Sequence, residues 1–215
     1  RLYGIWGSSD NSVYAAGGGW LDPVGPRGVV LHYDGSTWYE MASLDDSIFD
    51  LWGSSDADVY GAGGDGWGVG YVTTLLVHYD GSEWRELVSG WGDPLEAVWG
   101  SGPDDVFVVG RSKHISHYDS VTWSELSPDT HRSLQGIWGS GPNNVFAVGS
   151  DWNDAFGAFP VIVHYDGNAW VRMEHDFDDH QGLHAVWGSG TNDVFACGLF
   201  GTILHYGGSG PKIVR

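Results

Sequence analysis

The chain has 215 residues, 41% of them hydrophobic, and can bury the core of one domain. Its 28 acidic residues against 9 Lys and Arg give a formal net charge of −19. This balance argues against nucleic acid and anionic lipid as partners, because both need a cationic surface. A single cysteine excludes an internal disulfide framework, and no apolar run approaches the ~18–20 residues of a membrane span.

A motif of twelve residues recurs five times along the chain. It reads WGSSDNSVYAAG in the first copy and WGSGPDDVFVVG in the third. The copies begin at Trp6, Trp52, Trp99, Trp138 and Trp187, at intervals of 46, 47, 39 and 49 residues. This is the period of a four-stranded propeller blade, so the repeat predicts architecture before chemistry.

Four short strands are predicted in each copy. In the first copy they are LYGIW from Leu2, VYAAG from Val13, VVLHY from Val29 and TWYEM from Thr37. The last two form a hairpin around Asp34-Gly35, where glycine supplies the positive φ of a tight turn. The strands are apolar on both faces, as expected for sheets packed between two neighbours.

The hairpin signature HYDGxxW returns in every copy and decays in the last. It reads LHYDGSTW from Leu31, VHYDGSEW from Val77, SHYDSVTW from Ser116, VHYDGNAW from Val163 and LHYGGSGP from Leu204. In the last copy Gly207 and Pro211 replace the Asp and the Trp. We expect the fourth strand of that blade to be weak, absent or completed by residues outside this chain.

The predicted fold is therefore all-β, a five-bladed β-propeller of four-stranded antiparallel blades. A complete and an incomplete last blade both stay open. We expect a single domain, 1–215, with approximate blades 1–44, 45–91, 92–130, 131–178 and 179–215. The repeated Trp residues are interpreted as buried wedges between blades. The repeated His residues are expected to bond neighbouring strands or turns, because a site needed five times over is rarely an active site.

The paired motifs resemble the repeats of secreted bacterial β-propellers related to the Asp-box, or BNR, group. The Asp-box turn reads Ser-x-Asp-x-Gly-x-x-Trp, whereas here Asp34 and Gly35 are adjacent and the Ser is missing. The blade count and length are similar to tachylectin, a five-bladed sugar-binding propeller. Sialidases share the Asp-box and use an Arg cluster, but the seven arginines of this chain are scattered over different repeat positions.

The copies differ most between the second and third strands. From the motif Trp to the His of the hairpin signature are 26 residues in copies one, two and four, and 18 in copies three and five. The insertions begin at Gly18, Gly64 and Ser150. In a meander these connections share a face with the connections between blades, so residues that break the repeat gather there and mark the predicted binding face.

The candidate ligand-binding residues lie in these insertions and connections: Trp20, Trp67, Trp91, Asp93, Trp152, Phe156 and His180. Aromatic platforms beside carboxylates suit a pyranose ring, and Trp anchors equally suit a protein epitope. Two alternatives stay open. The insertion Trp residues can plug the mouth of their own propeller, and His175, Asp178 or His180 can hold a divalent ion.

We therefore expect a non-enzymatic recognition module, extracellular or at the cell surface, with the periplasm as an alternative. Its expected partner is a glycan or cell-surface polysaccharide. The alternative is a protein-interaction or structural propeller within a larger surface assembly, and a sialidase-like glycosidase is the minor alternative. No cofactor is predicted, and calcium stays open.

Overall fold

The structure is a computed structural model that describes residues 1–21, 25–65, 72–112, 114–126, 133–153, 157–174, 182–208 and 211–213. Within these ranges, the side chains of 20, 21, 25, 26, 152, 153, 157, 158 and 211–213 are not described. The contacts between residues divide the chain into two compact units, Arg1–Pro103 and Asp104–Arg215.

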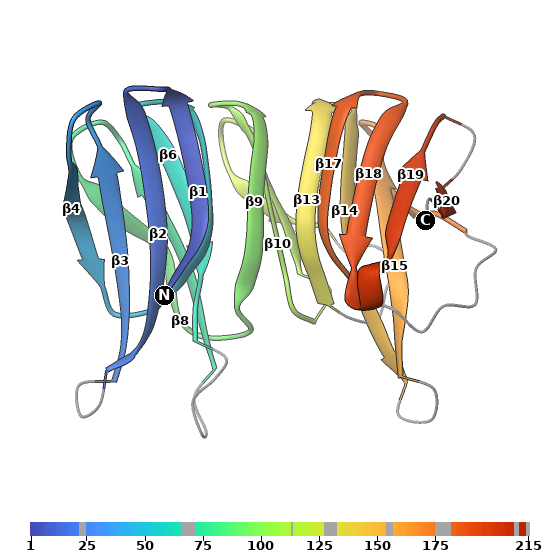
Figure 1. The fold of residues 1–215 in the computed structure, drawn as a ribbon, viewed down its shortest axis with the longest axis horizontal. Coiled ribbons are helices and arrows are strands. Elements are labelled where there is room, and N and C mark those ends of the chain that lie inside the picture. The colour runs from blue at the N-terminus through green and yellow to red at the C-terminus, as the bar shows by residue number, and fades with distance from the viewer. Residues whose placement is uncertain are drawn as a thin grey trace. The chain divides into compact units, whose positions relative to one another are not determined.

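The first unit contains nine strands, coloured blue to green in Figure 1. They are β1 (Leu2–Ser9), β2 (Ser12–Leu21), β3 (Gly25–Tyr33), β4 (Trp38–Leu44), β5 (Ile48–Ser55), β6 (Asp58–Gly63), β7 (Thr73–Tyr79), β8 (Trp84–Trp91) and β9 (Leu95–Gly102).

The second unit contains the remaining strands and one 3-10 turn, η1. They are β10 (Asp105–Gly110), β11 (Ile115–Tyr118), β12 (Trp123–Glu125), β13 (Ser133–Gly141), β14 (Asn144–Asn153), β15 (Gly157–Tyr165), β16 (Trp170–Arg172), β17 (Leu183–Gly190), β18 (Asp193–Gly198), η1 (Leu199–Gly201), β19 (Ile203–Tyr206) and β20 (Pro211–Ile213). No helix in the described residues is long and apolar enough to cross a membrane.

The strands form five four-stranded sheets, each in chain order from β1-β2-β3-β4 to β17-β18-β19-β20. One sheet therefore corresponds to one sequence repeat. The expected weak strand at the end of the chain is present as the three-residue β20, which pairs with β19 through Tyr206 and Pro211.

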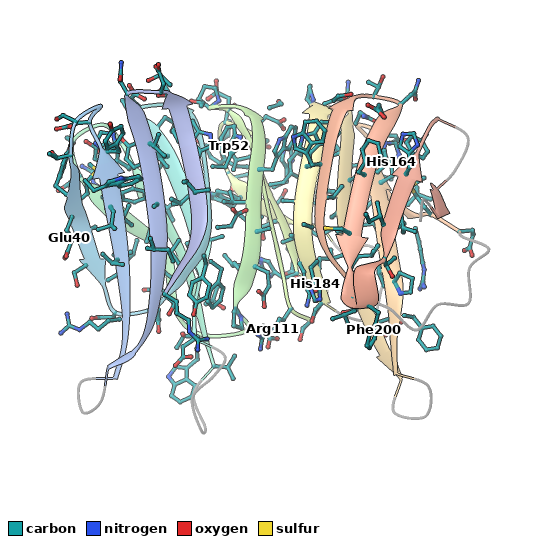
Figure 2. All side chains as sticks on the ribbon, in the orientation of Figure 1. Glu40, Trp52, Arg111, His164, His184 and Phe200 are labelled. Atoms are coloured by element: carbon teal, nitrogen blue, oxygen red, sulfur yellow. The ribbon has the colours of Figure 1, made fainter. Side chains whose placement is uncertain are left out.

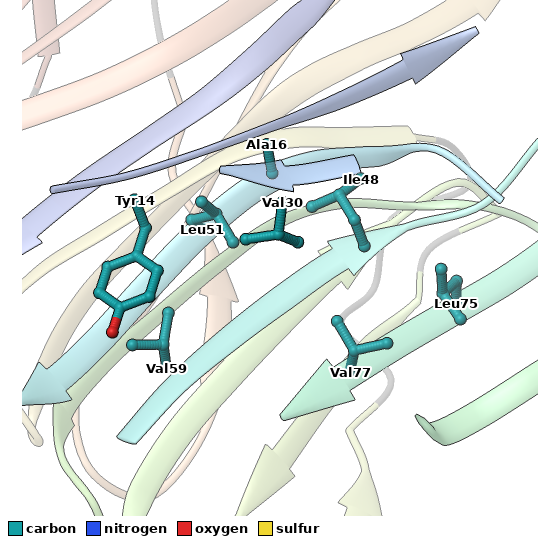
Figure 3. Packing of buried hydrophobic residues seen from close by; sticks show 8 residues of the cluster. All are labelled: Tyr14, Ala16, Val30, Ile48, Leu51, Val59, Leu75 and Val77. Atoms are coloured by element: carbon teal, nitrogen blue, oxygen red, sulfur yellow. The ribbon is translucent and has the colours of Figure 1, made fainter. Parts of the chain in front are cut away.

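Each unit has a core between successive sheets. In the first unit Tyr14, Ala16 and Val30 pack against residues of the next sheet, among them Ile48 and Leu51 (Figure 3). The core of the second unit repeats this pattern with the residues Phe146, Val148, Ile162, Leu183, Val194, Ala196 and Leu204. Branched and aromatic side chains on both faces of a sheet explain why no sheet is stable alone.

Trp6 and Trp138 pack between sheets, as predicted, but they are less buried than predicted. The indole of Trp6 covers Gly53 of the next sheet so closely that a Cβ on this glycine would lie 2.8 Å from the ring. Trp138 covers Gly188 in the same way, at 2.6 Å. These indoles remain half-buried, since they lie at the rim of the junction. Trp187 is 61% exposed, so for this residue the prediction of burial is wrong.

Two of the three insertions are not irregular loops but extensions of their strands. In the first sheet the pairing of β2 with β3 continues to Trp20↔Pro26 and Leu21↔Gly25. In the fourth sheet β14 and β15 continue to Asn153↔Gly157. Each ribbon projects beyond the other strands of its own sheet (Figure 1). In the second sheet, residues 66–71 lie outside the described residues.

Candidate functional site

The repeated His residues belong to the scaffold, as predicted. Nε2 of His78 lies 2.6 Å from Oδ1 of Asp58, and its ring stacks on Tyr60 at 4.3 Å between centroids. The same pair of contacts recurs in the other sheets, for His32, His117, His164 and His205. A ring held on one face and at one nitrogen by its own sheet links the strands of that sheet, as expected of a structural element.

The Asp residue of HYD closes the turn between the third and fourth strands. Oδ1 of Asp34 accepts hydrogen bonds from the backbone N–H groups of Ser36, at 2.9 Å, and Thr37, at 2.8 Å. These bonds, led by the one from Thr37, lower the pKa of Asp34 to about 2. The pKa values of the equivalent residues Asp80, Asp119 and Asp166 are also lowered by hydrogen bonds within their turns. Their side chains are therefore turn formers.

Asp50 is an exception within the first strands. It precedes Trp52 by two residues, where the other copies have Gly or Ala. Its carboxyl accepts hydrogen bonds from the N–H groups of Leu51, at 2.9 Å, and Val98 of β9, at 3.0 Å. Burial nevertheless raises its pKa to about 6, since the two hydrogen bonds offset only part of the desolvation.

One position of the first strands differs in every copy although its neighbours are repeated. Three residues before the motif Trp, the five copies carry Tyr3, Phe49, Glu96, Gln135 and His184. Within each unit, residues from adjacent sheets meet here. Tyr3 contacts Phe49 edge-on at 5.6 Å, and Nδ1 of His184 lies 2.6 Å from Oε1 of Gln135.

These variable residues lie near the start of the first strands, toward the end of each sheet where its second strand passes to its third. We call this the loop end. In the first unit the segment before β9 reaches it, because Gly92 N–H donates to Val72 O at 3.1 Å and Thr74 Oγ1 donates to Asp93 O at 2.6 Å. In the second unit Leu199 N–H donates to Gly182 O at 3.0 Å. The predicted shared face is confirmed within each unit.

Exposed aromatic side chains stand at the loop end of both units. Trp91, at the end of β8, is 77% exposed, and Asp93 beside it is also exposed. In the second unit Phe200 of η1 is 86% exposed and has a φ of 55°. Phe200 and His184 both lie toward the end at which the β14–β15 ribbon projects (Figure 2). A bulky residue in left-handed backbone costs free energy, which marks Phe200 as a candidate functional residue.

Solved structures resemble the chain, and two of them are described below. One is described as the crystal structure of RRP9 WD40 repeats, with a TM-score of 0.71 and 7% identity, covering 100% of this chain and 66% of that chain. The other is described as YCF48 bound to D1 peptide, with a TM-score of 0.61 and 16% identity, covering 99% of this chain and 66% of that one.

This protein is a β-propeller with five blades. WD40 repeats form propeller blades, and each of the five sheets corresponds to one blade of this kind. At such low identity the likeness shows the fold alone, and the chain spans slightly less than two thirds of each of these proteins. No family model matches the chain, and the search of curated proteins found no match.

The structure describes only some of the residues of the predicted site. Trp91 and Asp93 come together at one loop end. Trp20 and Trp152 lie on the β2–β3 and β14–β15 ribbons, with side chains outside the described residues. The other predicted residues, Trp67, Phe156 and His180, lie outside the described residues, as do His175 and Asp178.

Sequence reasoning missed two features of the loop end. The variable position before the motif Trp was visible as a column of five different residues. Phe200 had no signal, because its left-handed backbone is not encoded by a glycine. Among the described residues there is no group of three or more His, Cys, Asp or Glu that could hold a metal ion.

Proposed function

We propose that this protein is a non-enzymatic interaction propeller that binds a protein or peptide segment at its loop ends. The observation that carries this proposal is the pair of strongly exposed aromatic residues, Trp91 and Phe200, each at the loop end of its unit. Large aromatic side chains dominate binding energy at protein interfaces.

The fold supports the protein partner over the glycan partner. One solved propeller that resembles the chain is described as YCF48 bound to D1 peptide. The lopsided repeat also supports recognition, because blades three and five complete their sheets without the inserted residues. Selection for folding alone therefore does not account for the insertions.

The electrostatics favour a partner segment with basic residues. The chain carries a net charge of −19, and Asp93 accompanies the exposed Trp91 at one loop end. An acidic surface attracts a cationic segment and raises its association rate. We therefore expect the affinity for such a segment to fall as salt is raised.

The absence of catalysis and the location outside the cytoplasm are part of the proposal. The repeated His residues are engaged in stacking and hydrogen bonds, which supports a scaffold role for them. The resemblance to secreted repeat proteins supports an extracellular or cell-surface location. Fractionation of cells that express the natural protein tests this location.

The experiment is a selection from a random-peptide display library on the folded protein, in parallel with a glycan array with and without calcium. We expect enriched basic-aromatic peptides. We expect Trp91→Ser or Phe200→Ser to raise the Kd of one such peptide about tenfold or more, which is about 1.4 kcal/mol.

The matched control is Val121→Ser. Val121 is 84% exposed and lies in the turn after β11, at the opposite end of its sheet from the loop end. It should leave the Kd unchanged. Glycan binding without any peptide enrichment, or peptide binding that depends on Val121 and not on the two aromatic residues, contradicts the proposal.

A further inference from the structure

The junction between two successive sheets also receives the Trp of the hairpin signature. In the first unit Trp84, the first residue of β8, packs against the core shared by the first and second sheets. Its indole stacks on Tyr79 at 5.4 Å between ring centroids and meets Tyr14 of the first sheet edge-on at 6.4 Å. The indole therefore lies between an aromatic residue of its own sheet and one of the preceding sheet.

Trp170 has the same place in the second unit, between the third and fourth sheets. Its ring centroid lies 5.4 Å from that of Tyr165 in its own sheet and 5.9 Å from that of Phe107 in the third sheet. Nε1 of Trp84 and Nε1 of Trp170 are buried and have no hydrogen-bond partner among the described residues. We call this place the indole seat. It is apolar and holds the ring by packing.

The fifth sheet has no Trp at this position of its hairpin, which reads LHYGGSGP. Pro211 stands opposite Tyr206 in the pairing of β19 with β20. In the second sheet the residue opposite the equivalent Tyr79 is Trp84. The junction between the fourth and fifth sheets therefore has the two aromatic neighbours of an indole seat, Phe146 and Tyr206, without the indole.

A pocket lies in this junction. It holds about 280 Å³ of empty space, part of it open to solvent. Both sheets contribute apolar side chains to its lining, among them Phe146, Ile162, Met173, Val194, Leu204 and Tyr206. All of these residues belong to the second unit.

The aromatic walls of the pocket keep the geometry of an occupied seat. The rings of Phe146 and Tyr206 lie 5.2 Å apart at an angle of 52°. Beside Trp170, the equivalent rings of Phe107 and Tyr165 lie 5.4 Å apart at 59°. The two walls have therefore not closed over the space that the indole occupies in the other junction.

We propose that this pocket binds an indole ring, supplied by a Trp side chain of a partner polypeptide. The two occupied seats support the ring, because each accepts an indole between equivalent aromatic walls. They also support the polypeptide, since in both the indole belongs to the first residue of an edge strand, so a backbone at the sheet edge can deliver it. Trp side chains that fill apolar pockets are typical anchors of protein interfaces.

The two methionines of the chain report on binding in two different junctions. Met173 lines the pocket, whereas Met41 packs in the junction whose seat Trp84 fills. The chain is labelled with ¹³C in the methionine methyl groups and titrated with indole and with N-acetyltryptophanamide, a Trp residue with an amide bond on each side. We expect both compounds to shift the methyl resonance of Met173, with a Kd of about 1 mM or lower, and to leave that of Met41 unchanged.

N-acetylleucinamide is the matched control for the ring. It should bind at least about tenfold more weakly, because its side chain is smaller and cannot stack on aromatic walls. A Met173 resonance that does not move with indole overturns the proposal. Binding of indole but not of N-acetyltryptophanamide overturns the polypeptide as the source of the ring.

Filling the pocket should abolish binding. Pro211→Trp restores the residue of the other hairpins, and Ala196→Leu adds volume to a side chain that lines the pocket. We expect the Met173 resonance of either variant to stay unchanged on addition of indole, and Pro211→Trp to raise the melting temperature. Val121→Trp adds an indole at an exposed position and should bind as the unmodified chain does. Binding that survives both filling variants places the ring elsewhere and overturns the proposal.

Emptying an occupied seat should create the same site in the first unit. In Trp84→Ala, indole should shift the methyl resonance of Met41 as well as that of Met173. Circular dichroism checks that the variant is folded, and Trp84→Val replaces it if it is not. A folded variant whose Met41 does not respond contradicts the indole seat as the origin of the pocket. None of these variants changes Trp91 or Phe200, so the outcome is independent of peptide binding at the loop ends.

Discussion

Repeated residues have similar contacts from sheet to sheet in this propeller, whereas residues that depart from the repeat have contacts of their own. The repeated His residues stack and bond within their own sheets, and their role followed from repetition alone. The left-handed backbone of Phe200 could not be predicted, because no glycine marks it. Ser112 has the same backbone conformation in the equivalent connection of the third sheet, again without a glycine. Asp50 could be noticed as an exception, but its burial depends on the neighbouring β9.

Phe200→Gly separates strain from function. Removing a bulky residue from a φ of 55° should leave the free energy of unfolding unchanged or raise it by up to about 1 kcal/mol, since Phe200 is 86% exposed and buries little. Peptide affinity should fall. Ser112→Gly is the matched control, with the same stability change and unchanged affinity. A loss of more than about 1 kcal/mol in Phe200→Gly means that the side chain is structural. Urea unfolding measures the stability.

Asp50 predicts a pH dependence of stability. Its pKa is raised from 3.8 to about 6 in the folded protein, so the folded state prefers the protonated carboxyl. Its contribution is full below pH 4 and is lost as the pH rises through 6, an effect on the order of 3 kcal/mol. In Asp50→Asn this loss between pH 4 and 6 should disappear. Urea unfolding at several pH values measures it, and an unchanged slope contradicts the burial of the carboxyl.

At the scale of the element, strand order and turns were predictable because each repeat carries its own turn chemistry. Asp34 and Gly35 mark the hairpin turn, and the turn forms as expected, with Gly35 at a φ of 90°. The insertions were predicted as connections between strands. Those of the first and fourth copies instead extend the pairing of β2 with β3 and of β14 with β15. Pairing between two strands depends on register along both, which the composition of an insertion does not reveal.

The Trp-over-Gly junction predicts unequal costs for the same substitution. Trp138→Ala should lower the free energy of unfolding by about 2–4 kcal/mol, because it uncovers Gly188 and leaves a cavity in the junction. Trp187→Ala should cost less than about 1 kcal/mol, since this indole is exposed. Equal losses in urea unfolding would contradict the described junction.

At the scale of the whole molecule, the sequence predicted the five-bladed fold because a five-fold repeat leaves few alternatives. It did not predict the partner class, since exposed aromatic residues serve sugars and peptides alike. Of the predicted site residues, Trp91 and Asp93 are exposed at one loop end, and their role in binding stays a prediction. Residues that interrupt the repeat indicate where a ligand can bind. They do not indicate which ligand binds there.

The fourth blade tests whether the insertions serve binding. Replacing Ser150–Pro160 by the four residues Arg111–His114 of the third blade shortens the β14–β15 ribbon. It retains the pairing of Val148 with Ile162. The melting temperature should change little, while affinity for a selected peptide should fall at least about tenfold. Unchanged affinity, measured by titration calorimetry, would move the binding site away from this ribbon.

The indole of Trp6 and the glycine that it covers belong to different repeats, 47 positions apart in the chain. A larger residue at Gly53 would meet the indole of Trp6 as well as the backbone oxygen of Asp58 in its own sheet, so changes inside its own repeat cannot remove the contact with the indole. When repeats are duplicated, the motif Trp of one repeat and the motif Gly of the next must therefore be kept together. Among related chains, we expect correlated substitutions to lie one repeat period apart. We also expect the loss of a whole repeat to preserve the Trp–Gly contact, because the neighbouring repeats supply the same Trp and the same Gly.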